Sequence, residues 1–211
     1  STPNWNDMLD TSIRGLNKWA PLAAEFGVGF AIENHQDLGS EELLRYAEAA
    51  GRNVGICFDT GNPLAVGEDI VAFAKRVSGR VSHVHLKDYR VQFTDEGYRL
   101  VRCPIADGCA PFKVIEGILL SHHDHLTASL EPGALEARHV RLFTDEWWNG
   151  YPPRSARELG AAMRTARRNR LAEDEEYRTP WELHATGDEI VRYEKDVLKR
   201  SVDNMKQLGW L

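Results

Sequence analysis

Side chains with catalytic or metal-binding chemistry recur at a fixed interval in this chain, each at the end of an apolar segment. Glu33 closes VGFAIENH, Asp59 closes VGICFDTGN and His85 closes VSHVHLKD, and 26 residues separate each from the next. Glu131 ends a fourth segment, TASLEPG, 46 residues after His85, which leaves room for one further repeat and an insertion. One strand and one helix need about that length of chain. Parallel strands joined by helices direct their carboxyl ends to one edge, so the spacing predicts an α/β fold with these four side chains together.

The apolar pattern between these points supports alternating helices and strands. Residues 7–26 carry apolar side chains at three- and four-residue steps, typical of an amphipathic helix that Pro21 interrupts late. Residues 88–111 break the alternation with a hairpin signal around 94–97. The whole pattern favours a parallel sheet with right-handed crossovers. The expected strands are 28–33, 54–59, 81–86 and 126–131, and the expected helices are 7–26, 40–50, 68–77, 112–122, 154–176 and 187–208.

Charge and cysteine content exclude several classes of partner. The net charge is −6 and no strand or helix face carries a polybasic run, so nucleic acid is not an expected partner. An arginine cluster within 164–170 is followed by acidic residues at 173–176, which is typical of a solvated helix of mixed charge. Three cysteines without a CxxC spacing favour a reducing, cytoplasmic setting. No signal core or run of membrane-span length is present, so no membrane partner is expected.

The four strand-end residues form a ligand set rich in hard oxygen atoms. Three carboxylates and one imidazole suit Mn²⁺, with Mg²⁺ or Co²⁺ as alternatives, better than a metal that seeks thiolates. Glu131, which precedes a proline, could also be a plain surface carboxylate. Its position at the end of an apolar strand, in register with the other three, favours the ligand interpretation.

The motifs ENH, DTGN and HVHLKD resemble the sugar-phosphate isomerase/epimerase family, the xylose isomerase-like TIM barrels, over residues 7–131. The closing segment KRSVDNMKQLG resembles the last helix of that family. The resemblance implies one (β/α)8 barrel domain over 1–211, of which this chain supplies strands 5–8, the C-terminal half. It also implies an insertion at 88–111 after strand 7 and an aromatic, helical insertion at 132–186 before the final helix. A four-stranded parallel sheet alone leaves one face and both edges uncovered, so a second polypeptide or a homo-oligomer is expected to complete the barrel.

The resemblance also implies roles for the strand-end residues. Glu33, Asp59, His85 and Glu131 would hold one divalent ion, and the two glutamates would act as the acid/base pair. His35 is a further catalytic candidate, because a histidine in a cleft is a common acid–base group. Proton abstraction beside a carbonyl needs a base within reach and a cation near the oxygen that gains charge. The set therefore predicts enolisation chemistry.

Four other residues are candidates for substrate binding: Asn62, His83, Lys87 and Trp147. Asn62 stands where many members of the family have a histidine. His83 lies two residues before His85 and shares its side of the strand, either as a substrate contact or as a histidine of the barrel core. Trp147 is either a platform for an aromatic group or ordinary packing.

The stretch EWWNGYPPR looks like the metal-dependent subunit of bacterial C-glycoside deglycosidases, which cleave 3-oxo-C-glycosides. The resemblance therefore favours a lyase that breaks a C–C bond, with a ketose or sugar-phosphate isomerase/epimerase as the alternative. Against a ketose epimerase, position 91 is Val where some epimerases have arginine. An abasic-site endonuclease and a non-enzymatic sugar-binding subunit are further alternatives. The acidic net charge and Asn62 argue against the first, and the intact ligand set argues against the second.

Overall fold

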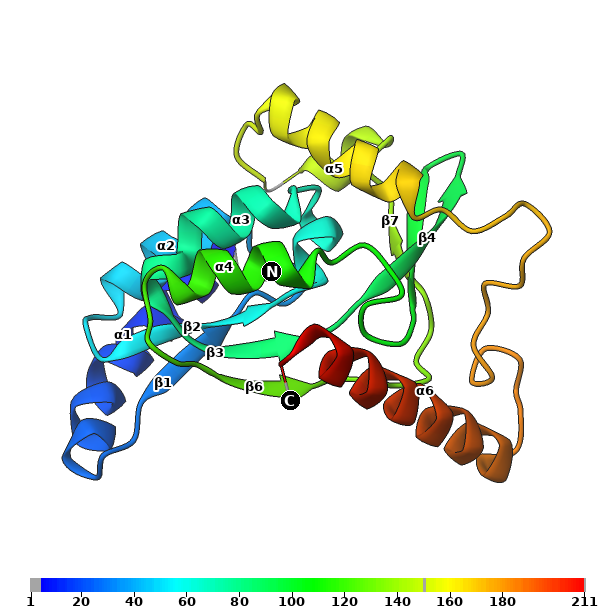
Figure 1. Ribbon diagram of the computed structural model, residues 1–211. Coiled ribbons are helices and arrows are strands. Elements are labelled where there is room, and N and C mark those ends of the chain that lie inside the picture. Colours follow the sequence, from blue (N-terminus) through cyan, green and yellow to red (C-terminus); the bar gives the residue numbers. More distant parts are fainter. Residues whose placement is uncertain (1–4, 150, 211) are drawn as a thin grey trace.

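Two sheets form the framework of the part of the chain that the structure describes. The computed structural model describes residues 5–149 and 151–210. The larger sheet is parallel, with the order β1-β2-β3-β6, and the smaller is antiparallel, with the order β4-β5-β7 (Figure 1). The expected parallel strands and the hairpin are thereby confirmed, whereas β7 was not expected. The strands are β1 (Phe30–Glu33), β2 (Val54–Asp59), β3 (Val81–Leu86), β4 (Tyr89–Thr94), β5 (Gly97–Arg102), β6 (Thr127–Leu130) and β7 (Arg138–Val140).

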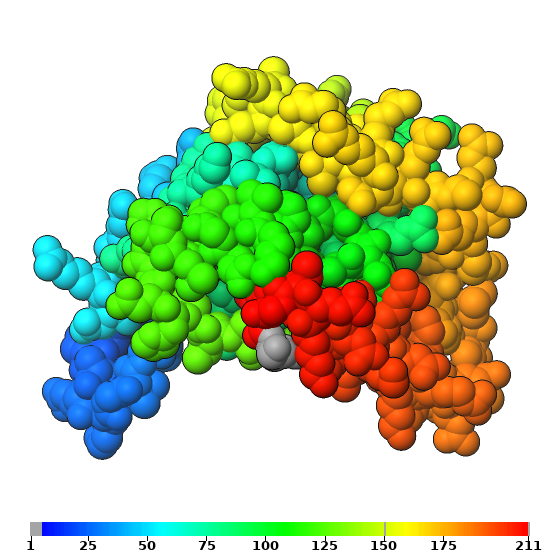
Figure 2. Space-filling model, in the orientation of Figure 1, coloured from blue at the N-terminus to red at the C-terminus, as the bar shows by residue number. Residues whose placement is uncertain are grey.

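Helices cover one face of the parallel sheet. α2 (Ser40–Ala49), α3 (Ile70–Val77) and α4 (Phe112–Leu120) lie side by side over it (Figure 1). Figure 2 shows the end of the last helix against the start of α4, where the rings of Phe112 and Trp210 meet edge-on with their centroids 6.2 Å apart. No helix within the described residues is both long enough and apolar enough to cross a membrane. The other helical elements are α1 (Trp5–Glu25), η1 (Asn62–Val66), η2 (Ser78–Arg80), η3 (Asp145–Trp148), α5 (Ala156–Arg168) and α6 (Gly187–Leu208).

The opposite face of the parallel sheet is polar, and a bulge determines which side chains lie on it. Ile56 pairs with Val81 but Cys57 pairs with His83, so Ser82 has no opposite residue on β2. An extra residue of this kind shifts the alternation of the strand by one. His83 and His85 therefore point to the same face as Asp59. Gly55 makes room for the bulge, because a Cβ at this position would lie 2.3 Å from the Ser82 hydroxyl oxygen.

Replacing Gly55 with alanine is expected to lower the free energy of unfolding by about 1–3 kcal/mol, the usual cost of overpacking. Changing Ser82 to glycine in the same chain should recover most of this loss, because the new methyl group would then have space. Gly117→Ala is the control, since nothing lies within 4 Å of its added Cβ and alanine favours the helix. Urea denaturation of the parent chain and of the three variants measures the effect. Equal losses with and without Ser82→Gly would contradict this account of the bulge.

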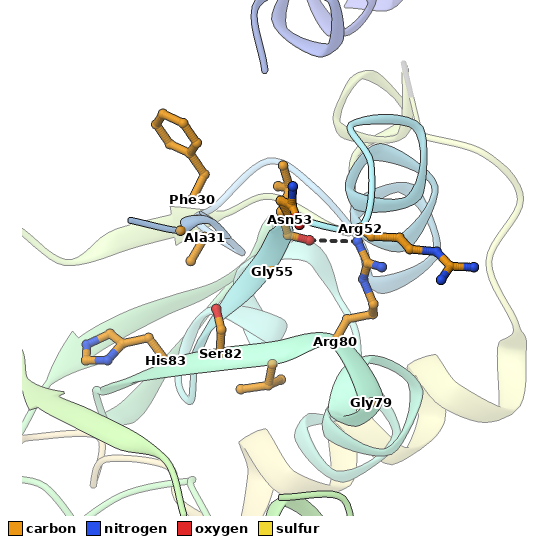
Figure 3. A pocket seen from close by; sticks show the side chains of 12 residues that line it. Phe30, Ala31, Arg52, Asn53, Gly55, Gly79, Arg80, Ser82 and His83 are labelled. Carbon is orange, nitrogen blue, oxygen red and sulfur yellow. Dashed lines mark hydrogen bonds between the residues drawn. The ribbon is translucent and has the colours of Figure 1, made fainter. Parts of the chain in front are cut away.

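A cavity of about 560 Å³ lies at the amino ends of β2 and β3, far along the strands from the four ligand candidates. Figure 3 shows Gly55, Ser82 and His83 along it. The Arg80 guanidinium donates hydrogen bonds to the carbonyl oxygens of Ala47, Gly51 and Val54, at 3.0, 2.9 and 2.6 Å. Arg80 thus ties α2 to β2 at this end of the sheet, and its role there is structural.

Two expectations about helices need correction. The helix expected at 154–176 ends at Arg168, so the acidic residues at 173–176 lie in a loop. The chain leaves the helix because residues beside it pair with β4: the Val91 N–H donates to Asn169 O at 3.0 Å, and the Leu171 N–H donates to Val91 O at 2.8 Å. Pro21, expected as an interruption, lies inside α1, which continues through it.

Candidate metal centre

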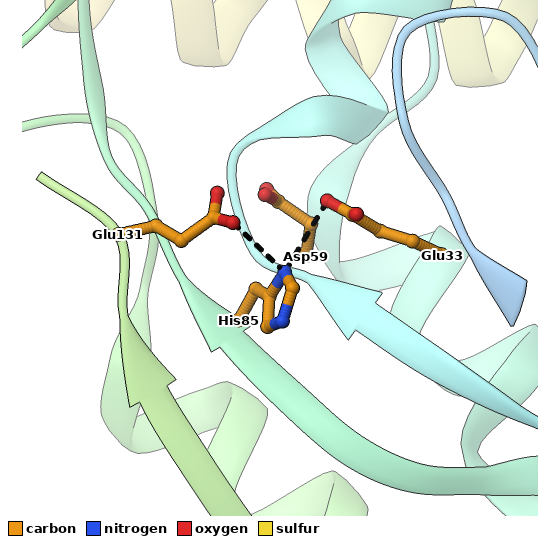
Figure 4. A group of neighbouring side chains, drawn as sticks. All are labelled: Glu33, Asp59, His85 and Glu131. Atoms are coloured by element: carbon orange, nitrogen blue, oxygen red, sulfur yellow. Dashed lines mark ion pairs between the residues drawn. The ribbon is translucent and has the colours of Figure 1, made fainter. Parts of the chain in front are cut away.

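The carboxyl ends of the four parallel strands bring Glu33, Asp59, His85 and Glu131 together, as the sequence predicts. One ligand atom from each lies within 4.8 Å of the others. His85 Nδ1 is 3.3 Å from Glu33 Oε1 and 3.2 Å from Glu131 Oε1 (Figure 4). Glu33 ends β1, Asp59 ends β2, His85 lies near the end of β3, and Glu131 follows β6 directly. Their convergence results from the parallel order β1-β2-β3-β6.

The donor atoms themselves fit a divalent cation. Glu33 Oε1 and His85 Nδ1 are buried, and no hydrogen bond from the described residues satisfies either atom. A buried polar atom without a partner is costly, so such atoms usually face a water or an ion. Both atoms point to the same small space, which three carboxylates and an imidazole surround. Such a donor set suits Mn²⁺ or Mg²⁺ and also accepts Zn²⁺.

Lys87 is an integral part of this cluster. Its ammonium nitrogen lies 2.6 Å from Asp59 Oδ2 and 2.6 Å from Glu131 Oε2, and only 3% of the side chain is exposed. Burial alone would lower the pKa of Lys87, but the Asp59 carboxylate raises it above the ordinary value, so the ammonium stays charged. Burial raises the pKa of Asp59, and Lys87 acts against that rise. The lysine therefore compensates part of the negative charge of the ligand set.

Backbone contacts hold Asp59 in place. Its Oδ1 atom accepts hydrogen bonds from the N–H groups of Gly61 and Asn62, at 2.9 and 3.0 Å, which leaves Oδ2 directed to the centre. The side chain of Asn34 bonds both backbone groups of Asp59: its oxygen accepts from the N–H at 2.6 Å, and its amide donates to the carbonyl at 2.9 Å. Asn34 was missed as a functional residue. The only sequence signal for it was a polar residue inside ENH, directly after a ligand.

Two buried polar residues hold the backbone next to the metal centre: Thr60 bonds Lys87, and Asp88 bonds the residues that follow. The hydroxyl of Thr60 donates to Lys87 O at 2.7 Å and accepts from Lys87 N–H at 2.9 Å. Asp88 is buried and accepts four backbone N–H groups, three of them from residues 106–110, so it orders the loop after β5. Burial raises the pKa of Asp88 to about 7, although these N–H groups act to lower it. The polar side chains of Thr60 in DTGN and Asp88 in LKD therefore have a structural role and are not proposed as metal ligands.

The substrate-binding candidates are distributed differently around the centre. Asn62 is fully buried; its amide donates to Asn34 O at 3.0 Å, and its oxygen accepts from the Tyr89 hydroxyl at 3.3 Å. His83 lies beside His85, with ring centroids 5.4 Å apart, and contacts the hydroxyls of Thr127 and Ser129. Asn62 thus helps to place Asp59, whereas His83 lies on the open face of the sheet.

The remaining two candidates lie farther out. The exposed side chain of His35 follows β1 on the loop after Glu33. Trp147 packs over Gly67, meets Trp148 edge-on at 4.6 Å between centroids, and lies 4.9 Å from the Tyr151 ring. These contacts favour packing for Trp147. The catalytic role of His35 and substrate contact by Asn62, His83, Lys87 and Trp147 remain predictions.

Cys57 lies between the ligands on the same face but does not qualify as a ligand. Burial, together with the negative charges of Glu33 and Asp59, raises the pKa of Cys57 to about 12. A thiolate is the form of cysteine that binds metals. The protonated thiol is therefore a small apolar side chain beneath the centre.

Comparison with known proteins supports the fold and the motifs. The family model described as "Xylose isomerase-like TIM barrel" matches residues 2–146. The rhizopine catabolism protein MocC of Rhizobium meliloti is 40% identical over 80 residues, which cover 36% of this chain and 25% of that protein. An inosose dehydratase of Geobacillus thermodenitrificans is 34% identical over 91 residues, which cover 41% of this chain and 30% of that protein. The matched region thus spans about a quarter to a third of these relatives.

A solved structure agrees at the level of the fold. A xylose isomerase-like TIM barrel protein from Mycobacterium smegmatis, in complex with magnesium, superposes with a TM-score of 0.51 at 15% identity. The match covers 76% of this chain and 49% of that one. The family model covers more than half of this chain. The four ligand candidates at the ends of the parallel strands of this chain lie together in the structure. The chain therefore belongs to the xylose isomerase-like TIM barrel family.

Proposed function

We propose that this protein is a divalent-metal-dependent enzyme that removes a proton beside the carbonyl group of a sugar or cyclic polyol. The observation that carries the proposal is the convergence of Glu33, Asp59, His85 and Glu131, where Glu33 Oε1 and His85 Nδ1 are buried and accept or donate no hydrogen bond within the described residues. Mn²⁺ is the proposed ion, as the sequence predicts, and Mg²⁺ or Zn²⁺ also suits the donors. The names of the relatives, which include inosose dehydratases, support carbohydrate chemistry.

The residues divide the work of an elimination reaction between them. A bound divalent ion would polarise the carbonyl and the neighbouring hydroxyl of the substrate, which acidifies the proton on the carbon beside the carbonyl. Glu33 or Glu131 accepts that proton, since both carboxylates border the same space. The electron pair left on carbon then expels a group from the next carbon. A general acid protonates this leaving group, and the candidate is His35, whose exposed side chain lies on the loop that follows Glu33.

An elimination reaction is consistent both with the predicted lyase and with the relatives that are named inosose dehydratases. Loss of water from an inosose and loss of the aglycone from a 3-oxo-C-glycoside both begin with removal of a proton beside a carbonyl group. We propose the lyase class first, with the 3-oxo-C-glycoside as the favoured substrate. The alternative is isomerisation or epimerisation, in which the same proton returns to carbon instead of a group being expelled.

Proton exchange in D₂O tests the shared first step. The chain loaded with Mn²⁺ is incubated with a 3-oxo-C-glycoside, an inosose and a ketose, and the signal of the proton beside each carbonyl is followed by NMR. We expect exchange for at least one substrate, and its product identifies the class: free aglycone, dehydrated inosose or an epimeric ketose. Chelation with EDTA should abolish the exchange. If the metal-loaded protein exchanges this proton in none of the three substrates, the proposal is wrong.

We also propose that a second polypeptide or another copy of the chain covers the open face of the parallel sheet. The edge strands β1 and β6 have no further partner among the described residues, and Ser82, Thr127 and Ser129 on the uncovered face are exposed. Unpaired strand edges favour pairing with another chain. Native mass spectrometry is the measurement, and a monomer at micromolar concentration would contradict the proposal.

A further inference from the structure

A second cavity, of about 440 Å³, lies beside the antiparallel sheet. The end of β5 forms one wall, the loop segment 171–179 another, and α6 closes it with Tyr193 and Arg200. Four arginines line this space, an unusual density of cation donors for a chain with a net charge of −6. The cavity therefore raises the question of which anions balance them.

Protein carboxylates balance all but one of these arginines. The three pairs are Arg90 with Glu175, Arg178 with Glu176 at 2.7 Å, and Arg200 with Asp107 at 2.7 Å. The fourth, Arg102, has no hydrogen bond or ion pair from its guanidinium to any of the described residues. It is only partly exposed, so water solvates it incompletely. One positive charge in the cavity is thus left without a carboxylate partner among the described residues.

Arg102 also lies at the border between this cavity and the metal centre. Its Nη1 atom would be 3.1 Å from a Cβ atom added to Gly133, two residues after Glu131. The absence of a side chain at Gly133 leaves the approach from the centre to Arg102 open.

We propose that Arg102 binds an anionic group, a carboxylate or a phosphate, on a ligand that extends from the metal centre into this cavity. A guanidinium presents two parallel N–H donors that match the two oxygens of such a group. This inference rests on the proposed metal centre for the position of the rest of the ligand. It narrows the substrates proposed above to those that also carry a carboxylate or a phosphate group, and it makes Arg102 the residue that selects them.

Three matched probes test the assignment: methyl glucoside is neutral, methyl glucuronide carries a carboxylate and glucose 6-phosphate carries a phosphate. Their affinities for the Mn²⁺-loaded chain are measured by titration calorimetry. We expect one anionic probe to bind at least about tenfold more tightly than the neutral one, the effect of one charge-assisted hydrogen bond. The tighter of the two identifies the anion.

Substitutions of arginines in the cavity test whether Arg102 causes the tighter binding of the anionic probe. Arg102→Gln should abolish it and Arg102→Lys should retain part of it, whereas Arg178→Gln, which removes a paired arginine of the same cavity, should leave it unchanged. Equal or undetectable binding of all probes, or a preference that survives Arg102→Gln, overturns the inference. If Arg102→Gln does not fold, Arg102→Lys tests the proposal. Lysine cannot make the bidentate contact, so this variant should bind the anionic probe more weakly and the neutral probe as before.

A separate titration of Mn²⁺, followed by electron paramagnetic resonance, distinguishes the two proposals. Metal binding without an anion preference rejects only the role of Arg102. An anion preference that depends on Arg102, in a chain that binds no Mn²⁺, rejects the metal centre and keeps the anion site.

Discussion

Replacing Lys87 with methionine is expected to lower the free energy of unfolding by about 3–5 kcal/mol. Removal of one partner from a buried ion pair leaves an uncompensated charge, and this cost is typical of such a loss. Asp59 has no exposed side-chain surface, and the Lys87 ammonium is the cation 2.6 Å from its Oδ2 atom. Methionine keeps the length and apolar character of the stem, so the measured loss reports the charge. Urea denaturation in the presence of EDTA is the measurement.

Added Mn²⁺ provides an internal control for this variant. A divalent ion near Asp59 and Glu131 would replace the missing positive charge, so the gain in stability on adding metal should be larger in Lys87→Met than in the parent chain. Lys113→Met is the matched variant at the surface. Lys113 pairs with Glu116 at 2.9 Å but is more than half exposed, and such pairs contribute less than about 1 kcal/mol. A loss in Lys87→Met no greater than that in Lys113→Met would contradict the buried charge balance.

Glu33→Gln is expected to weaken Mn²⁺ binding by at least about a hundredfold, because even residues that only support a metal ligand cost 10–100-fold when changed. The substitution keeps the shape of the side chain and removes its charge. No described residue hydrogen-bonds Glu33 Oε1, so the free energy of unfolding without metal should change by less than about 0.5 kcal/mol. Glu33→Gln therefore measures metal affinity without a change in stability. A variant of Asp59 would change both, because Asp59 also pairs with Lys87 and holds the backbone.

Glu136→Gln is the control for Glu33→Gln, since Glu136 is an exposed carboxylate on the loop between β6 and β7. It should bind Mn²⁺ as the parent chain does. Titration of Mn²⁺ into each variant, with the free ion followed by electron paramagnetic resonance, gives the affinities. Equal affinities of Glu33→Gln and Glu136→Gln would show that Glu33 is not a ligand.

The sequence predicted the elements around the site better than the contacts within it. The interval between Glu33, Asp59 and His85 was sufficient because a parallel sheet places every strand end at one edge, whatever the loops do. Lys87 was assigned to substrate, since its spacing from His85 does not say that its ammonium would lie between two carboxylates. That arrangement depends on the pairing of β2 with β3 and β3 with β6, which is a three-dimensional property.

The region after Pro132 was predicted less well, for two physical reasons. The three residues of β7 are too few to show a two-residue alternation, and they pair with β5, about 40 residues earlier. The end of α5 is set by hydrogen bonds of its following residues to Val91, far away in sequence. Arg102 was missed for a related reason. An unpaired arginine is visible only once the partners of its neighbours are known.

The bulge in β3 means that the number of residues in this strand and the direction of its side chains can change independently. Ser82 is the residue without an opposite number on β2, so a chain shortened by Ser82 would pair regularly and would still direct His83 and His85 to the side of Asp59. A chain lengthened by one residue at the same place could also pair regularly and keep both histidines on that side, but His83 would then lie opposite Asp59 and His85 would lie two residues, about 6.6 Å, farther along the strand. One-residue changes of length here are therefore asymmetric for the metal centre, because a deletion leaves His85 opposite Asp59 and an insertion moves it away.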